Sequence, residues 1–153
     1  MLTAYRIVKA RYADDAFAGI ASRRHGGRWN PPGIPIVYTS ATISLAALET
    51  LAHIESTVLN EFVVIQCWFP EVLVEAIELA TLPDGWSAVP PPATLQQIGY
   101  EWFTRRTSAV LQVPSVVVDG RESNYLLNPE HEDFRSIDIG SPQPFLFDYR
   151  LFT

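Results

Sequence analysis

Apolar residues along the chain are grouped in short runs, most of them rich in β-branched and aromatic side chains. Such side chains pack well on a pleated, half-buried surface, so the runs predict strands. The clearest run is EFVVIQCWF at residues 61–69, which we expect to be a buried strand with residues 72–79 as its neighbour. The other predicted strands are residues 2–8, 34–39, 109–111, 115–118, 124–127, 135–139 and 145–147.

Helical patterns are fewer. The stretch 43–55, ISLAALETLAHIE, predicts a helix, and either Thr42 or Ser44 can cap the free amides of its first turn. A second helix is expected to begin at Thr94 and to run to about residue 106. Before it, residues 82–92 contain three consecutive prolines, which cannot enter the interior of a sheet, so this segment is predicted to be a surface loop.

The order of these elements indicates the fold class. Strands outnumber helices, and the helices do not alternate regularly with the strands, so we predict the α+β class rather than a doubly wound sheet. The chain of 153 residues has no repeat, low-complexity tract or linker. We therefore expect one domain spanning residues 1–153.

Charge and hydropathy disfavour several classes of function. The net charge is −6 and Lys9 is the single lysine, which disfavours direct nucleic-acid binding because phosphate neutralisation needs clustered Lys and Arg. No run approaches the ~18 apolar residues of a membrane span. The first ten residues lack the pattern of a secretory signal, so the cytoplasm is the expected location and no membrane partner is predicted.

Cysteine and histidine do not form a metal-binding pattern. Cys67 is alone and lies in an apolar run, where a buried, inert thiol is expected. His25, His53 and His131 are far apart in the sequence and lack the spacing of known zinc motifs. We predict no metal.

The strongest functional signal lies in residues 26–55. A loop rich in Gly and Pro carries Arg28, a short apolar run ends on Tyr38, and the predicted helix carries Glu49. On a helical wheel Leu45, Leu48 and Ala52 form an apolar stripe, with Glu49 beside it. A carboxylate next to an apolar stripe is costly unless it is paired or kept for chemistry.

Three blocks of sequence carry a family resemblance. The first, GGRWNPPG–IVYTS–SLAALETLAH, begins at Gly26; the second, VPSVVVDGRESNYLLNPEHEDF, spans residues 113–134; the third, FLFDYRL, spans residues 145–151. Together, and in this order, they resemble the RES domain, the toxin half of a class of bacterial toxin–antitoxin systems. Residues 61–109 lie outside the three blocks.

The resemblance implies an ADP-ribosyltransferase-like fold, with a split, mostly antiparallel β core and peripheral helices. In such folds NAD, as the substrate, lies in a cleft between two sheets, and its nicotinamide–ribose bond is cleaved. The residue types needed are a carboxylate near the ribose, a positively charged fork for the pyrophosphate and an aromatic ring against the nicotinamide. Glu49, Arg28 and Tyr38 correspond to these three roles.

The family serine and a further polar contact come from the second block. Either Ser115 or Ser123 can be the family serine, and Ser115 is the better match. Asn124 is a candidate ribose or amide contact, because its side chain can both donate and accept hydrogen bonds. It can equally hold the turn before the strand that follows.

The resemblance leaves the acceptor of ADP-ribose open. Water or inorganic phosphate would make the protein an NAD glycohydrolase or phosphorylase, and a protein target would make it an ADP-ribosyltransferase. The family also implies an Xre-like antitoxin that blocks the active-site cleft. Two other hypotheses are a nonenzymatic module that binds a nucleotide or peptide and, less favoured by the acidic charge, a ribonuclease toxin.

Overall fold

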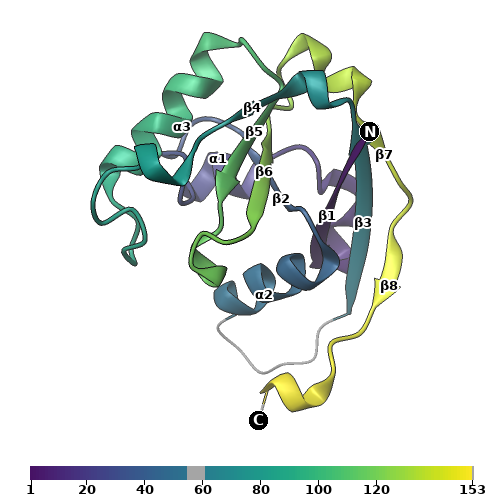
Figure 1. The fold of residues 1–153 in the computed structure, drawn as a ribbon. Coiled ribbons are helices and arrows are strands. Elements are labelled where there is room, and N and C mark those ends of the chain that lie inside the picture. Colours follow the sequence, from purple (N-terminus) through teal and green to yellow (C-terminus); the bar gives the residue numbers. More distant parts are fainter. Residues whose placement is uncertain (55–60, 153) are drawn as a thin grey trace.

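The computed structural model of the protein describes residues 1–54 and 61–152. In this part of the chain an eight-stranded, curled sheet forms the centre, with strand order β4-β5-β6-β2-β1-β3-β7 and β8 paired to β3 (Figure 1). The strands are β1 (Leu2–Lys9), β2 (Val37–Ser40), β3 (Phe62–Phe69), β4 (Val74–Ala76), β5 (Val110–Pro114), β6 (Ser123–Leu127), β7 (Asp138–Ile139) and β8 (Gln143–Phe145).

The sheet is antiparallel at every pairing except β4 with β5, which is parallel. Its longest pairing joins β1 and β3 over their whole length, from Leu2 opposite Phe69 to Lys9 opposite Phe62. The helices lie around the sheet and do not connect parallel strands in a regular way. This confirms the predicted α+β class with a mostly antiparallel core and peripheral helices.

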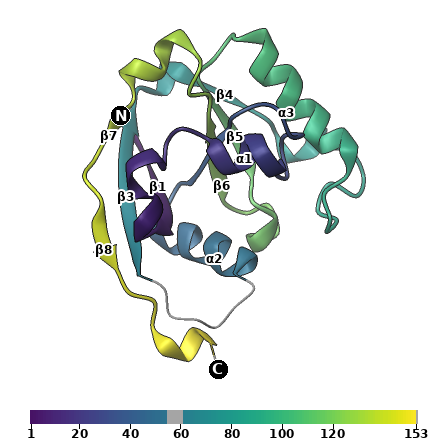
Figure 2. The ribbon, with the colours of Figure 1, turned by 180° about the vertical axis from the view of Figure 1, so that it is seen from behind.

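Three α-helices are described: α1 (Ile20–His25), α2 (Ile43–His53) and α3 (Ala93–Arg105). Short 3₁₀ helices lie at η1 (Ala10–Asp15), η2 (Glu71–Leu73), η3 (Leu79–Thr81), η4 (Val116–Val118), η5 (Glu132–Ser136) and η6 (Tyr149–Phe152). Figures 1 and 2 place α3 beside β4 and β5, and α2 near the end of β5 where η4 follows. None of the described helices is long and apolar enough to cross a membrane.

Helix α2 is capped by Thr42, whose hydroxyl accepts a hydrogen bond from the Leu45 amide at 3.1 Å. The predicted apolar stripe is correct only at Leu45, because Leu48 is 43% exposed and Ala52 is also exposed. The buried residues of α2 are Leu45 and Ala46, and Ala46 packs beside β1. Glu55, the predicted last residue of this helix, lies outside the described residues.

Strand alternation places a set of polar side chains on one face of the sheet. Tyr38 and Ser40 are two residues apart in β2 and so share a face. They pair across the sheet with Leu126 and Asn124 of β6, and Asn124 pairs in turn with Val113 of β5. Leu126 and Val113 pack against α3 in the apolar cluster described next. The polar side chains of this face therefore lie between the region that α3 covers and the region near α2.

Two large apolar clusters lie on the two faces of the sheet. Under α3 the cluster contains Trp29, Ile36, Leu95, Trp102, Phe103, Leu111, Val113 and Leu126. The other contains Ala4, Val37, Cys67, Phe69, Ala109, Val110, Tyr125, Leu127 and Ile137. Burial raises the pKa of the Cys67 thiol to about 12, so the predicted inert thiol is confirmed as a buried one.

Three local predictions were wrong. Residues 74–76 pair in parallel with β5 and not with β3, because η2 turns the chain away after Pro70. Residues 116–118 form a 3₁₀ turn, which Asp119 and Gly120 close with positive φ angles. Helix α3 begins after Pro92, and no side chain caps it, so Thr94 is not its cap.

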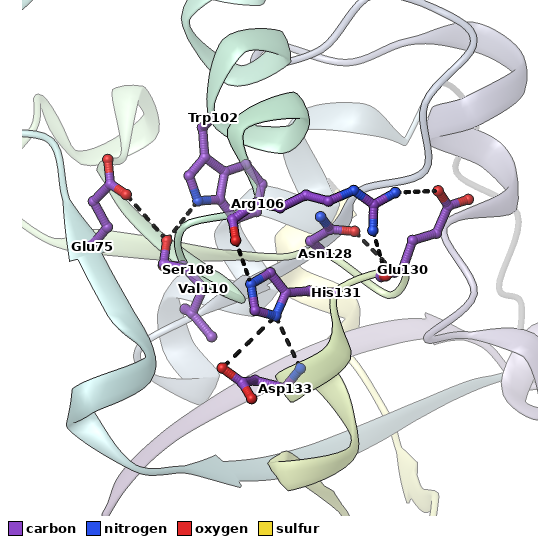
Figure 3. Close-up of polar contacts among 9 residues, drawn as sticks. All are labelled: Glu75, Trp102, Arg106, Ser108, Val110, Asn128, Glu130, His131 and Asp133. Carbon is purple, nitrogen blue, oxygen red and sulfur yellow. Dashed lines mark hydrogen bonds and ion pairs between the residues drawn. The ribbon is translucent and has the colours of Figure 1, made fainter.

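A polar network ties the end of α3 to the turn after β6 (Figure 3). The buried His131 ring lies between the Arg106 carbonyl and the Asp133 amide, each at 2.9 Å. The Trp102 indole donates to the Ser108 hydroxyl at 2.8 Å. The Asn128 side-chain oxygen accepts from the Glu130 amide at 2.9 Å and so stabilises the turn after β6. These bonds satisfy the polar groups of the buried His131 and Trp102 side chains, whereas the buried side-chain nitrogen of Asn128 has no hydrogen-bond partner among the described residues.

Candidate active site

Glu49 of α2 contacts the polar side chains that lie on the sheet face near this helix. The Asn124 side-chain amide of β6 donates to Glu49 Oε2, and the Ser115 hydroxyl, directly after β5, lies 3.4 Å from the same oxygen. Three elements far apart in the sequence therefore meet at one carboxylate. Two donors directed at one oxygen orient the carboxylate group rather than leaving it free to rotate.

The structure distinguishes the environments of the two candidate serines. Ser115 is buried and faces Glu49. The Ser123 hydroxyl instead accepts a hydrogen bond from the Gln112 side chain at 3.1 Å, within the β5–β6 pair. Ser115 is thus the serine that lies beside the carboxylate.

Ser40 belongs to the same group, although the sequence analysis did not single it out. Its buried hydroxyl donates to Asn124 Oδ1 at 2.7 Å. Because this bond occupies the carbonyl side of the Asn124 amide, the NH₂ side must face Glu49. A signal was present: Ser40 is two residues after Tyr38 on a predicted strand, so period-two alternation places both on one face.

Arg28 lies at the tip of a tight turn, Gly27–Asn30, that is closed by a 2.9 Å hydrogen bond from the Gly27 amide to the Asn30 carbonyl. Its guanidinium Nη1 donates to the carbonyls of Trp86 and Ala88, at 3.1 and 2.9 Å. Arg28 therefore connects the turn to the predicted surface loop at residues 82–92.

Electrostatics links Arg28 to the other two predicted residues. Partial burial lowers the pKa of Arg28, and the negative charge of Glu49, followed by the Tyr38 oxygen, acts against this shift. The charges of Arg28 and Glu49 therefore influence each other, and Tyr38 contacts the turn that carries Arg28.

Tyr38 supports the turn through its hydroxyl. The hydroxyl donates to Asn30 Oδ1 at 2.5 Å and accepts from the Trp29 amide at 3.1 Å. Burial raises the pKa of Tyr38 well above its usual range, so the phenol stays neutral and is unsuited to act as a base. Gly27 permits this arrangement, because a Cβ atom there would lie 2.6 Å from the Tyr38 oxygen.

His53, which follows Glu49 on α2, lies outside this group. The His53 ring hydrogen-bonds the backbone carbonyl of Glu49 at 2.8 Å and not its carboxylate. Within residues 1–54 and 61–152, no cluster of three or more His, Cys, Asp or Glu side chains could hold a metal ion. The arrangement offers a held carboxylate, a nearby cation and amide and hydroxyl groups, which suits chemistry at a centre that develops positive charge.

Comparison with known proteins identifies the family of this chain. The model of the RES domain matches residues 3–148, which include Arg28, Tyr38, Glu49, Ser115 and Asn124. The chain belongs to the RES domain family.

Relatives of this RES domain protein match it over most of their length. It is 40% identical over 150 residues to "Toxin Res" of Yersinia enterocolitica, covering 96% of this chain and 97% of that protein. It is 37% identical over 131 residues to "Toxin Res" of Photorhabdus laumondii, covering 85% and 83%. It is also 36% identical over 145 residues to "Prs ADP-ribosylating toxin" of Sphingobium sp., covering 92% and 89%.

Proposed function

We propose that this RES domain protein is a toxin enzyme that binds NAD and cleaves the bond between nicotinamide and ribose. The observation that carries the proposal is the Glu49 carboxylate, which Asn124 and Ser115 contact on one sheet face while Arg28 lies within its electrostatic reach. The names of the relatives support a toxin, and the one called an ADP-ribosylating toxin supports this reaction class.

The reaction needs little acid–base help from the protein. The bond between ribose C1′ and the nicotinamide nitrogen breaks, and its electron pair leaves with nicotinamide, which departs as a neutral molecule. The ribose develops oxocarbenium character, which a nearby carboxylate stabilises, as in glycoside hydrolysis. An oxygen or nitrogen of the acceptor then bonds to C1′ and releases its proton. In this scheme Glu49 lies next to the ribose.

The remaining residues would bind and orient NAD. Arg28 would bind the pyrophosphate through its guanidinium, since arginine pairs with phosphate in a two-pronged geometry. Asn124 and Ser115 would hold Glu49 and contact the ribose hydroxyls. Because the Tyr38 hydroxyl is bonded to Asn30 and Trp29, a contribution of Tyr38 to nicotinamide binding would come from its ring.

Incubation of the purified protein with NAD tests the proposal. We expect free nicotinamide to accumulate, measured by chromatography. Absence of release, combined with normal NAD binding, would support a nonenzymatic binding module instead. Release of oligonucleotides from added RNA, without nicotinamide, would support a ribonuclease.

The same assay identifies the acceptor. With NAD labelled in its ADP-ribose part and a cell lysate added, label in protein indicates an ADP-ribosyltransferase, the outcome that the name of the Sphingobium relative favours. Label in free ADP-ribose indicates a glycohydrolase. Label in a phosphorylated ADP-ribose that forms only with added phosphate indicates a phosphorylase.

A toxin of this kind needs an inhibitor in its own cell, and we propose an Xre-like antitoxin that covers Glu49 and Arg28. A partner carboxylate can occupy the position that we assign to the pyrophosphate beside Arg28. The net charge of −6 fits a division of labour in which the antitoxin, and not this chain, binds DNA.

Expression of this chain alone in a bacterial host should therefore arrest growth, and co-expression of the antitoxin should restore it. The Glu49→Gln variant is the control and should leave growth unaffected at the same protein level. Colony counts and culture density measure both effects. If the wild-type chain is harmless while its NAD cleavage is intact in vitro, the toxin assignment is wrong and the enzymatic one stands.

A further inference from the structure

The turn that carries Arg28 has few internal bonds of its own. Gly27 and Asn30 exchange two backbone hydrogen bonds, of 2.9 and 3.4 Å, and the turn has no further ladder on either side. A two-residue bridge is a weak support for a side chain that must meet a ligand in a defined position. Other elements must therefore fix the turn.

Helix α3 supplies that support through Gln96. Its side-chain NH₂ donates to the carbonyl of Gly27 at 2.9 Å and to the carbonyl of Asn30 at 3.2 Å. These are the two residues that close the turn, so one amide spans both ends of the segment with Arg28 between them. Both partners are carbonyl oxygens, which fixes the orientation of the Gln96 amide.

Two further contacts hold the same turn against α3. The Trp29 side chain is buried in the apolar cluster together with Leu95 and Trp102 of the helix. Gly99, one turn after Gln96, faces the Trp29 carbonyl so closely that a Cβ atom at this position would lie 1.6 Å from the Trp29 oxygen. The backbone of the turn therefore rests directly on the helix, and Gln96 is the polar part of this contact.

We propose that Gln96 is a positioning residue that holds Arg28 in place for the pyrophosphate of NAD. The inference rests on the proposed function for its ligand, whereas the clamp itself is a property of the turn. Gln96 acts through the turn backbone and not by touching the substrate. Gln96, which lies outside the three family-like blocks, thus becomes part of the binding machinery, whereas exposed residues of the same helix do not.

Gln96→Met is the test, because methionine has similar length but cannot donate to the two carbonyls. We expect the KM for NAD to rise ~10-fold while kcat changes less than ~2-fold, since the loss falls on binding through Arg28 and not on Glu49. Gln97→Met is the matched control: Gln97 is exposed on the same helix and bonds only Glu101, at 3.2 Å, among the described residues. It should leave both constants unchanged.

A double-mutant cycle separates positioning from general destabilisation. If Gln96 works through Arg28, then adding Gln96→Met to Arg28→Ala should raise the KM no further than Arg28→Ala alone. Fully additive effects would overturn the proposal, as would an unchanged KM in Gln96→Met. Gln96→Asn, which is one methylene shorter and retains an amide, is the milder variant if Gln96→Met does not fold, and it should show the same split between KM and kcat.

Hydrogen exchange measured by mass spectrometry tests the clamp without NAD. The peptide covering residues 26–31 should exchange faster in Gln96→Met than in the wild type or in Gln97→Met. Unchanged exchange would overturn the clamp. If exchange increases while the wild-type protein releases no nicotinamide, the clamp stands and the proposed NAD function fails, so the two ideas are separable.

Discussion

Glu49→Gln should lower the turnover of NAD at least ~10²-fold, because it removes the negative charge that stabilises the developing oxocarbenium ion. Glutamine has the shape of glutamate and keeps a carbonyl oxygen that can accept from Asn124 and Ser115, the two donors that contact Glu49 in the structure. The fold should therefore be retained. Nicotinamide release under saturating NAD measures the loss, and circular dichroism during heating checks the fold.

Glu101→Gln is the matched control for this substitution. Glu101 is an exposed residue of α3 whose described side-chain contact is the Gln97 amide, so the charge change is the same but lies away from the candidate site. It should leave turnover unchanged. Near-normal turnover by a folded Glu49→Gln protein would remove Glu49 from the mechanism and with it the central part of the proposed function.

Gly99→Ala should destabilise the protein severely, with a loss of ~3 kcal/mol or more in the free energy of unfolding. Helix propensity alone predicts the opposite sign, because alanine is favoured over glycine in a helix by about 1 kcal/mol. Packing decides here: the added Cβ atom would lie 1.6 Å from the Trp29 carbonyl oxygen and 2.7 Å from its carbon. These are backbone atoms, so the helix and the Arg28 turn must separate.

Urea denaturation followed by tryptophan fluorescence measures this effect. Trp29 and Trp102 are both buried where α3 meets the turn, so the signal reports the affected region. Gln97→Ala on the exposed side of α3 is the control and should be neutral or slightly stabilising. A Gly99→Ala protein with wild-type stability would mean that α3 does not rest on the Trp29 backbone, and it would also remove the basis for assigning Gln96 to the turn.

The sequence by itself determined the elements whose signals are local. The β-branched run at residues 61–69 became β3, because such side chains suit a buried strand wherever the chain leads it. The helix after Thr42 was predictable from its cap, although the apolar stripe expected on it was correct only at Leu45. The fold class followed from the order of these elements. Arg28, Tyr38 and Glu49 could be selected as residue types whose chemistry belongs together, with the family resemblance to support the choice.

Only the tertiary structure decided which residues meet. Asn124 of β6 and Ser115, directly after β5, reach Glu49 from more than sixty residues further along the chain, and no local pattern encodes that meeting. The exposure of Leu48 and the pairing of β4 with β5 depend on what packs against them, so the helical wheel and the β propensity could not predict them. In the sequence Gln96 and Gly99 are indistinguishable from other helix residues. Their structural role arises because the Arg28 turn lies against them. Local propensity acts over a few neighbouring residues, whereas side-chain packing and hydrogen-bond partners are set by the whole sheet. The candidate site consists almost entirely of such long-range contacts, so only the tertiary structure could reveal it.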